Sequence, residues 1–107
     1  MLKINEIKDY IKERSKDPDF KAKDITEDYY YSYTYICNFT RKYTNMTVKE
    51  LLDKYRFSRA IYQLKHTNLT ITEISEKFGL REDAFRRRFK KKYHTSPLQY
   101  RKQSRGL

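Results

Sequence analysis

Apolar residues recur at helical spacing along almost the whole chain, and this pattern predicts an all-α fold of about seven helices. The clearest part lies between residues 70 and 101. A short helix there carries its apolar side chains on one face, and Gly79 supplies the positive φ angle that a tight turn needs. A second helix follows over 82–93, with Phe85 and Phe89 facing inward. Two helices joined by a tight turn are typical of a helix-turn-helix.

Helix starts are marked by capping boxes, in which a hydroxyl and a side chain three residues later each bind the other residue's backbone amide. Boxes begin at Thr47, Thr70 and Ser96, and Pro97 follows the last one at the first helical position. The box at Thr47 opens the longest predicted helix, which ends near Lys65. Its roughly 18 residues would span about 27 Å at roughly 1.5 Å per residue.

The N-terminal half shows the same pattern less clearly. Residues 2–14 predict an amphipathic helix, and the segment 16–19 predicts a loop, since a proline disfavours helix at the residue before it. Residues 20–31 predict a short second helix with apolar side chains on its inner face. Ser32 is the expected N-cap of a third helix over 33–43.

A shift of 49 residues aligns the two halves. Ile36 then matches Phe85, and the capping box at Thr47 matches the one at Ser96. Asn45 and His94 both fall at a helix end, where a left-handed residue is expected. The predicted parts are a lead-in helix and loop (1–19), a first helix-turn-helix (20–46), a linker helix (47–66), and a second helix-turn-helix with a C-terminal helix (67–107).

Charge is unevenly placed along the chain. Residues 1–31 hold seven Lys/Arg against eight Asp/Glu, a balance of −1, and residues 32–107 hold eighteen against six, a balance of +12. The sum is the net charge of +11. A basic surface confined to one part of a chain predicts a phosphate-backbone partner, whereas a merely solvated surface would not need such segregation.

Several classes of protein are disfavoured by what the sequence contains. One cysteine, Cys37, excludes an internal disulfide and favours a reducing cytoplasm. No apolar run approaches the roughly 18 residues of a membrane span. Cys37, His66 and His94 lack metal-ligand spacing, and no phosphate-binding glycine loop is present. We therefore expect a cytoplasmic protein that is not an enzyme and needs no metal or cofactor.

Five segments also carry a family resemblance: RFSRA at 56–60, ITEISEKFGL at 71–80, Phe85, FKK at 89–91 and SPLQYR at 96–101. With them, residues 20–101 resemble the DNA-binding domain of AraC/XylS-type transcription regulators. Residues 7–20 are similar to the helix that leads into this domain in regulators with a phosphoacceptor receiver. The resemblance implies two recognition helices in successive major-groove segments about 34 Å apart, spaced by the linker helix.

Site residues follow from the resemblance, position by position. The implied base contacts are Arg87, Asp83 and Ala84 in the second helix-turn-helix, and Thr34, Cys37 and Asn38 in the first. Arg87 is the strongest candidate on chemistry, because a guanidinium can pair with guanine O6 and N7. The expected phosphate contacts are Arg86, Lys90, Lys91, Lys92, Arg41, Lys42, Thr47 and Ser96.

Four features depart from the family pattern or stay open. Thr40 stands where the family prefers a buried aromatic, and Asn45 and His94 stand where it prefers glycine. The tyrosine-rich run 29–35 fills a turn and the core, or else stacks on bases or binds phosphate. Arg56 has either a functional role or a hydrogen-bonding role beneath the linker helix.

The sequence thus predicts a sequence-specific, double-stranded DNA-binding output domain of a bacterial transcription regulator. We expect a monomer as an isolated domain, with RNA polymerase and a sensor or receiver domain outside this chain as further partners. One alternative is an adaptor or anti-activator that keeps the fold and works through protein contacts. Another is binding of RNA or single strands through the tyrosine run and the basic helix.

Overall fold

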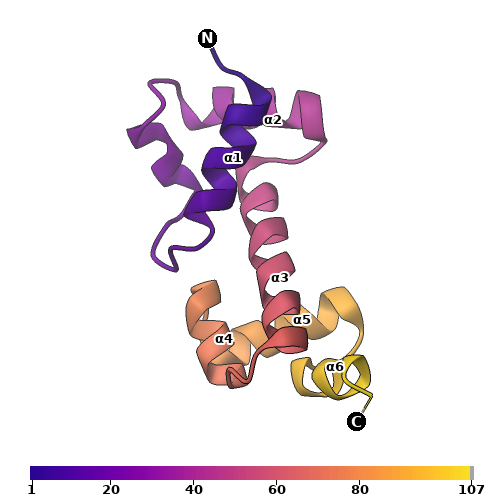
Figure 1. Cartoon of the computed structure of the whole chain (residues 1–107). Coiled ribbons are helices and arrows are strands. Elements are labelled where there is room, and N and C mark those ends of the chain that lie inside the picture. The colour runs from indigo at the N-terminus through magenta and orange to yellow at the C-terminus, as the bar shows by residue number, and fades with distance from the viewer. Residues whose placement is uncertain (107) are drawn as a thin grey trace. The chain divides into compact units, whose positions relative to one another are not determined.

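The computed structural model describes residues 1–106, which form helices and loops without a strand. Figure 1 traces the seven helices along the chain. Their bounds are α1 (Ile4–Arg14), η1 (Ala22–Glu27), α2 (Tyr33–Thr44), α3 (Val48–His66), α4 (Ile71–Phe78), α5 (Glu82–Tyr93) and α6 (Pro97–Ser104). The predicted all-α class with two helix-turn-helix motifs is confirmed. The chain divides into two compact units within α3: unit 1 covers Met1–Arg56, and unit 2 begins at Phe57.

Unit 1 is built on α1, η1, α2 and the first half of α3. Its buried core is mainly aliphatic and consists of Ile7, Ile11, Phe20, Ile25, Ile36, Cys37, Val48, Leu51 and Leu52. The predicted α-helix over 20–31 is wrong in type and length. The structure has a six-residue 3-10 helix there, whose first turn is closed by the Asp24 carboxylate accepting from the Lys21 amide at 2.9 Å. Such short connectors are commonly 3-10 helices, and this one still buries Ile25 as expected.

Unit 2 contains the second half of α3 and helices α4 to α6. Its buried core is largely aromatic and consists of Phe57, Ala60, Leu64, Ile71, Ile74, Phe78, Phe85 and Phe89. The predicted inward placement of Phe85 and Phe89 is confirmed, since neither is accessible to solvent. Their ring centroids lie 5.8 Å apart, and Phe78 lies 5.5 Å from Phe85. Ile61 and Leu80 lie half-buried at its edge.

Three arginines bind backbone carbonyls inside their own units. Arg56 donates to the carbonyls of Asp17 and Phe20, both at 2.7 Å, which selects the hydrogen-bonding role and closes the loop after α1. Arg101 and Arg105 both donate to the Leu64 carbonyl in the last turn of α3, at 3.1 and 3.2 Å. Because the last carbonyls of a helix have no partner within it, these guanidiniums cap α3. Burial, together with the neighbouring charge of Arg105, lowers the pKa of Arg101.

Candidate nucleic-acid interface

The second helix-turn-helix is defined by the turn between α4 and α5. The capping box at the start of α4 is formed, since Thr70 Oγ1 accepts from the Glu73 amide at 3.0 Å and Glu73 Oε1 from the Thr70 amide at 3.2 Å. Gly79 ends α4 with φ 89°, and the next amide, that of Leu80, returns to the Ser75 carbonyl at 3.1 Å. A positive φ of this kind is natural for glycine. The turn therefore starts α5 at Glu82, as the sequence predicts.

The outer face of α5 is strongly basic. This helix holds six Lys/Arg against two Asp/Glu, a formal charge of +4. Arg87 and Lys91 are exposed, while Phe85 and Phe89 fix the opposite side of the helix in the core. Asp83 is exposed and pairs with Arg81 at 3.6 Å, and Ala84 is half-buried beside it. The predicted direction of Arg87, away from the protein, is confirmed.

The four other basic candidates on α5 differ in their surroundings. Lys90 is exposed near Lys91, whereas Arg86 donates from Nε to Glu82 at 3.0 Å. Glu82 also accepts from the Thr72 hydroxyl of α4. The hydrogen bond from Thr72 is the larger cause, and the one from Arg86 the second, of a Glu82 pKa below its ordinary value. The Lys92 ammonium lies 4.9 Å from the centre of the Phe57 ring. Arg86 and Lys92 are thus held against unit 2, and Lys90 and Lys91 extend from it.

Helix α2 presents the corresponding surface of unit 1. Ser32 Oγ accepts from the Tyr35 amide at 3.1 Å and caps the helix start, as predicted. Asn45 ends the helix with φ 61°, which confirms the expected left-handed residue. Thr34, Asn38, Arg41 and Lys42 are all exposed. The Asn38 side-chain oxygen accepts from Arg41 at 3.1 Å, so the amide and guanidinium are presented together.

Cys37 is the one predicted base contact that the structure places inside. Its exposed fraction is 7%, and it belongs to the core of unit 1. The buried face of α2 is wider than expected, because Ile36, Cys37 and Thr40 all point inward. Thr40 Oγ1 lies 2.9 Å from the Met46 carbonyl and 3.1 Å from the Cys37 carbonyl, which satisfies this buried hydroxyl. This burial disfavours Cys37 as a base contact.

Thr47 and Ser96, which we predicted as phosphate contacts, both begin helices. Thr47 Oγ1 accepts from the Glu50 amide at 3.2 Å, and Glu50 Oε1 accepts from the Thr47 amide at 3.1 Å. Ser96 Oγ accepts from the Gln99 amide at 3.1 Å. Each hydroxyl is half-buried and used as an acceptor, which leaves its proton available to an anion.

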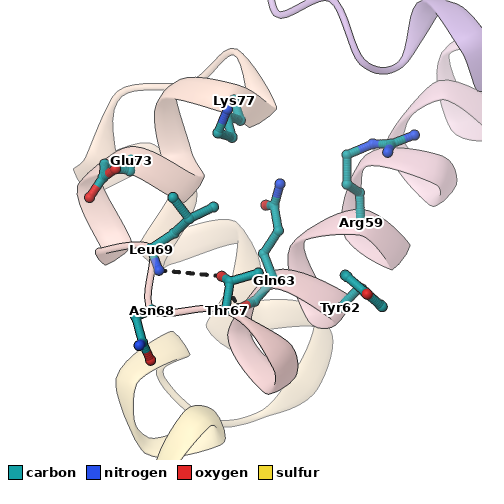
Figure 2. Close-up of a pocket in the computed structure, with 8 residues that line it drawn as sticks. All are labelled: Arg59, Tyr62, Gln63, Thr67, Asn68, Leu69, Glu73 and Lys77. Atoms are coloured by element: carbon teal, nitrogen blue, oxygen red, sulfur yellow. Dashed lines mark hydrogen bonds between the residues drawn. The ribbon is translucent and has the colours of Figure 1, made fainter.

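Unit 2 also has an open groove between α3 and α4, with a volume of about 620 Å³. Figure 2 shows Lys77 on one side and Arg59 and Tyr62 of α3 on the other. Its lining is Arg59, Tyr62, Gln63, Thr67, Asn68, Leu69, Glu73 and Lys77. Thr67 Oγ1 donates to the Gln63 carbonyl at 2.7 Å and accepts from the Leu69 amide at 3.3 Å. These polar groups close the turn after α3, and Glu73 belongs to the capping box described above.

Comparison with known proteins identifies the fold. A helix-turn-helix domain family matches residues 25–103, from η1 to α6. The chain belongs to this family. Its AraC-type character follows from the solved relatives below, which are C-terminal domains of response regulators. As a member, the chain is a DNA-binding helix-turn-helix domain of transcription regulation.

Two solved structures are similar to this AraC-type domain in sequence and fold. The C-terminal domain of AraT, a response regulator from Geobacillus stearothermophilus, is 28% identical with a TM-score of 0.86, over 94% of this chain and 84% of that one. The C-terminal domain of the two-component response regulator yesN from Fusobacterium nucleatum is 28% identical with a TM-score of 0.84, over 91% of this chain and 95% of that one.

A third structure supports the fold alone. The xylose-binding transcription activator xylR is 24% identical with a TM-score of 0.76, over 89% of this chain and 25% of that one. The search of curated proteins returned no significant match. Within residues 1–106, no helix is both long and apolar enough to cross a bilayer.

The surface of unit 1 also exposes two residues of the tyrosine-rich run that the predicted base and phosphate contacts did not include. Tyr31 and Tyr35 are exposed at the start of α2, and their rings stack with centroids 4.9 Å apart. A sequence signal was present, because Tyr35 precedes Asn38 by three positions and Lys42 by seven, which puts all three on one stripe of a helix. Choosing that stripe required knowing that Cys37 is buried.

Proposed function

We propose that this domain binds double-stranded DNA at specific sequences as the output domain of a bacterial transcription regulator. The observation that carries the proposal is the exposed guanidinium of Arg87, opposite the buried rings of Phe85 and Phe89 and flanked by Lys90 and Lys91. A cationic outer face on the second helix of a helix-turn-helix suits the major groove. The AraC-type family and the 49-residue repeat support placing α5 and α2 in successive major-groove segments.

Base readout in this proposal follows side-chain chemistry. Arg87 pairs with guanine O6 and N7, and Asn38 pairs with adenine N6 and N7. Asp83 accepts from cytosine N4, and Ala84 and Thr34 offer methyl groups to thymine. Cys37 has no part, because it is buried.

Phosphate contacts position the domain on the duplex without reading sequence. We assign this role to the remaining predicted residues: Arg86, Lys90, Lys91, Lys92, Arg41, Lys42, Thr47 and Ser96. Arg86 and Lys92 reach phosphate only by leaving Glu82 and the Phe57 ring, so we expect Lys90 and Lys91 to contribute more. The solved relatives are response-regulator domains, which supports a receiver or sensor domain outside this chain. We further propose RNA polymerase as a partner and a monomeric domain in the bacterial cytoplasm.

The test begins by selecting bound sites from a random duplex pool. The affinity of the wild type and of Arg87→Ala is then measured on the selected duplex and on a scrambled one. We expect Arg87→Ala to weaken selected-site binding by about 1–3 kcal/mol, with a much smaller change on the scrambled duplex. Equal losses on both would reassign Arg87 to phosphate.

Arg87→Lys is the matched control, because it keeps the charge and removes the bidentate fork. It should bind scrambled duplex like the wild type and lose discrimination at the selected site. No binding to any duplex at low salt would overturn the proposal in favour of an adaptor role. Competition by single strands as strong as by duplex would favour single-strand binding.

A further inference from the structure

The tyrosine-rich run 29–35 separates into a half-buried and an exposed set. Tyr29 and Tyr33 pack against the core of unit 1, which confirms core filling for these two. Tyr30, Tyr31 and Tyr35 are instead 94%, 39% and 53% exposed. Exposed aromatic rings that gather at one helix start are typical of a surface that binds a partner molecule.

Tyr31 and Tyr35 form one rigid feature within this exposed set. Their rings are nearly parallel, with an interplanar angle of 13° and centroids 4.9 Å apart. Between them, Ser32 fixes the helix start by accepting from the Tyr35 amide at 3.1 Å. Each ring covers one face of the other, so the Tyr35 side chain is held in place before any partner arrives. Such preorganisation lowers the entropy cost of binding.

The pair lies on the outer stripe of α2. Tyr35 shares this stripe with Asn38 and Lys42, on the side of the helix away from the buried Cys37 and Thr40. The first turn of α2 carries no acidic residue, so nothing there repels phosphate. Because the N-terminal residues of a recognition helix reach base edges, Tyr35 is placed beside the bases and Tyr31 beside the backbone.

We propose that Tyr35, buttressed by Tyr31, contacts DNA in the half-site of unit 1 and selects thymine through its 5-methyl group. The inference rests on the proposed function and names a specificity residue for α2. Thymine is the only DNA base that presents a methyl group in the major groove, and an aromatic ring is an apolar surface for it. Tyr35 then supplies readout that we had expected from Cys37.

The experiment uses the full chain and the duplex selected from the random pool. Each thymine is replaced singly by uracil, which keeps the base pair and removes only the methyl group. The wild type should lose about four-fold in affinity at one thymine, which corresponds to the roughly 0.8 kcal/mol of one buried methyl group. Tyr35→Ala should lose a similar factor on the unmodified duplex and no longer distinguish thymine from uracil at that position.

Two control variants keep the result specific. Tyr35→Phe should keep the thymine preference, because the ring remains. Tyr43→Ala removes another tyrosine of α2 with a nearly equal exposed fraction, 55%, whose ring packs against Phe39, and it should leave the preference unchanged. Because Ala84 and Thr34 are also assigned thymine methyl groups, a loss in the wild type belongs to Tyr35 only at the position where Tyr35→Ala abolishes it. A wild-type series without any loss needs no variant and overturns the proposal by itself.

The proposal is overturned if no thymine-to-uracil change weakens wild-type binding, or if Tyr35→Ala binds the selected duplex like the wild type. An equal loss for Tyr35→Ala on selected and scrambled duplexes also overturns it. In those outcomes a specific loss for Arg87→Ala would leave the proposed function intact. Failure of the wild type to bind any duplex overturns both.

Discussion

Unit 1 and unit 2 repeat one helical plan with different side chains inside. The left-handed residues that end α2 and α5 have nearly the same backbone, with φ 61° at Asn45 and φ 62° at His94. Five residues before the left-handed residue in each unit, the 49-residue shift matches Thr40 with Phe89. Unit 2 fills that place with an aromatic ring, and unit 1 fills it with a hydroxyl bonded to the Met46 carbonyl. The backbone plan therefore survives the exchange of an apolar contact for a polar one.

The outer faces of the two recognition helices differ as much as their cores. α5 has a formal charge of +4, and α2, with two Lys/Arg and no Asp/Glu, has +2. The three outer positions of α2, Tyr35, Asn38 and Lys42, hold a ring, an amide and an ammonium. We expect unit 2 to contribute more of the salt-dependent affinity and unit 1 to depend more on neutral contacts.

The largest difference should come from the matched core positions. Phe89→Ala should cost about 3–5 kcal/mol, because it removes a fully buried ring and leaves a cavity. Thr40→Val should cost only about 1–3 kcal/mol, mainly because the Met46 carbonyl loses the shorter of its two hydroxyl contacts and keeps Thr44 Oγ1 at 3.3 Å. Urea denaturation followed by circular dichroism measures both. A cost for Thr40→Val equal to that for Phe89→Ala would contradict the distinction between an aromatic and a polar filling.

Next in size is the salt dependence of DNA binding. Replacing both Lys90 and Lys91 with alanine should make the slope of log K against log salt shallower by about 1.8, since each phosphate contact contributes about 0.9. Arg41→Ala should change this slope by less than the roughly 0.9 of one phosphate contact, because the Arg41 guanidinium is bonded to Asn38. Titrations at several salt concentrations give the slopes. An unchanged slope in the double variant would remove these lysines from the phosphate contacts.

A smaller effect should separate the two left-handed residues. A side chain at positive φ is strained by roughly 1–2 kcal/mol, although asparagine tolerates this region better than most residues. His94→Gly should therefore stabilise unit 2 by about 1 kcal/mol, after the greater freedom of glycine in the unfolded chain is deducted. Asn45→Gly should change unit 1 by only a few tenths. Thermal unfolding of both variants measures this, and equal gains would show no advantage for asparagine.

The smallest effect concerns the Glu82 carboxylate. Its pKa is lowered in the folded state by the Thr72 hydroxyl and Arg86, so its contribution to stability is present above the ordinary value of 4.5 and is lost as pH falls through the folded value. The wild type should therefore melt above Glu82→Gln at pH 7, and the gap should close as pH falls through the lowered pKa of Glu82. Asp28→Asn gives the counterpart in unit 1, where the Tyr10 hydroxyl and Arg14 lower the pKa of Asp28. A gap that widened in acid would contradict the assignment.

Much of this structure follows from local patterns in the sequence. The capping boxes at Thr47 and Thr70, the turn at Gly79 and the inward rings of Phe85 and Phe89 depend on residues within about two helical turns of each other. The direction of Arg87 follows from the same spacing, since it lies two positions from each ring. These features need no knowledge of what packs against them.

The remaining features depend on contacts between distant parts of the chain. Cys37 is buried because Thr40 and Ile36 turn that side of α2 inward, and the helical pattern alone allows either side. The 3-10 form of η1 and the exposed Tyr31–Tyr35 stack depend on how unit 1 packs. The base and phosphate roles stay predictions, because they concern a partner outside the chain.

The arginines that bind backbone carbonyls limit what can be concluded from a basic composition. Arg56, Arg101 and Arg105 are each anchored to two or more main-chain oxygens, so their positive charges hold the protein's own backbone together. Lysine would be a poor replacement at any of the three, since one ammonium lacks the planar fork that spans neighbouring oxygens. Counting cations along such a chain therefore overestimates the number that are free to meet nucleic acid.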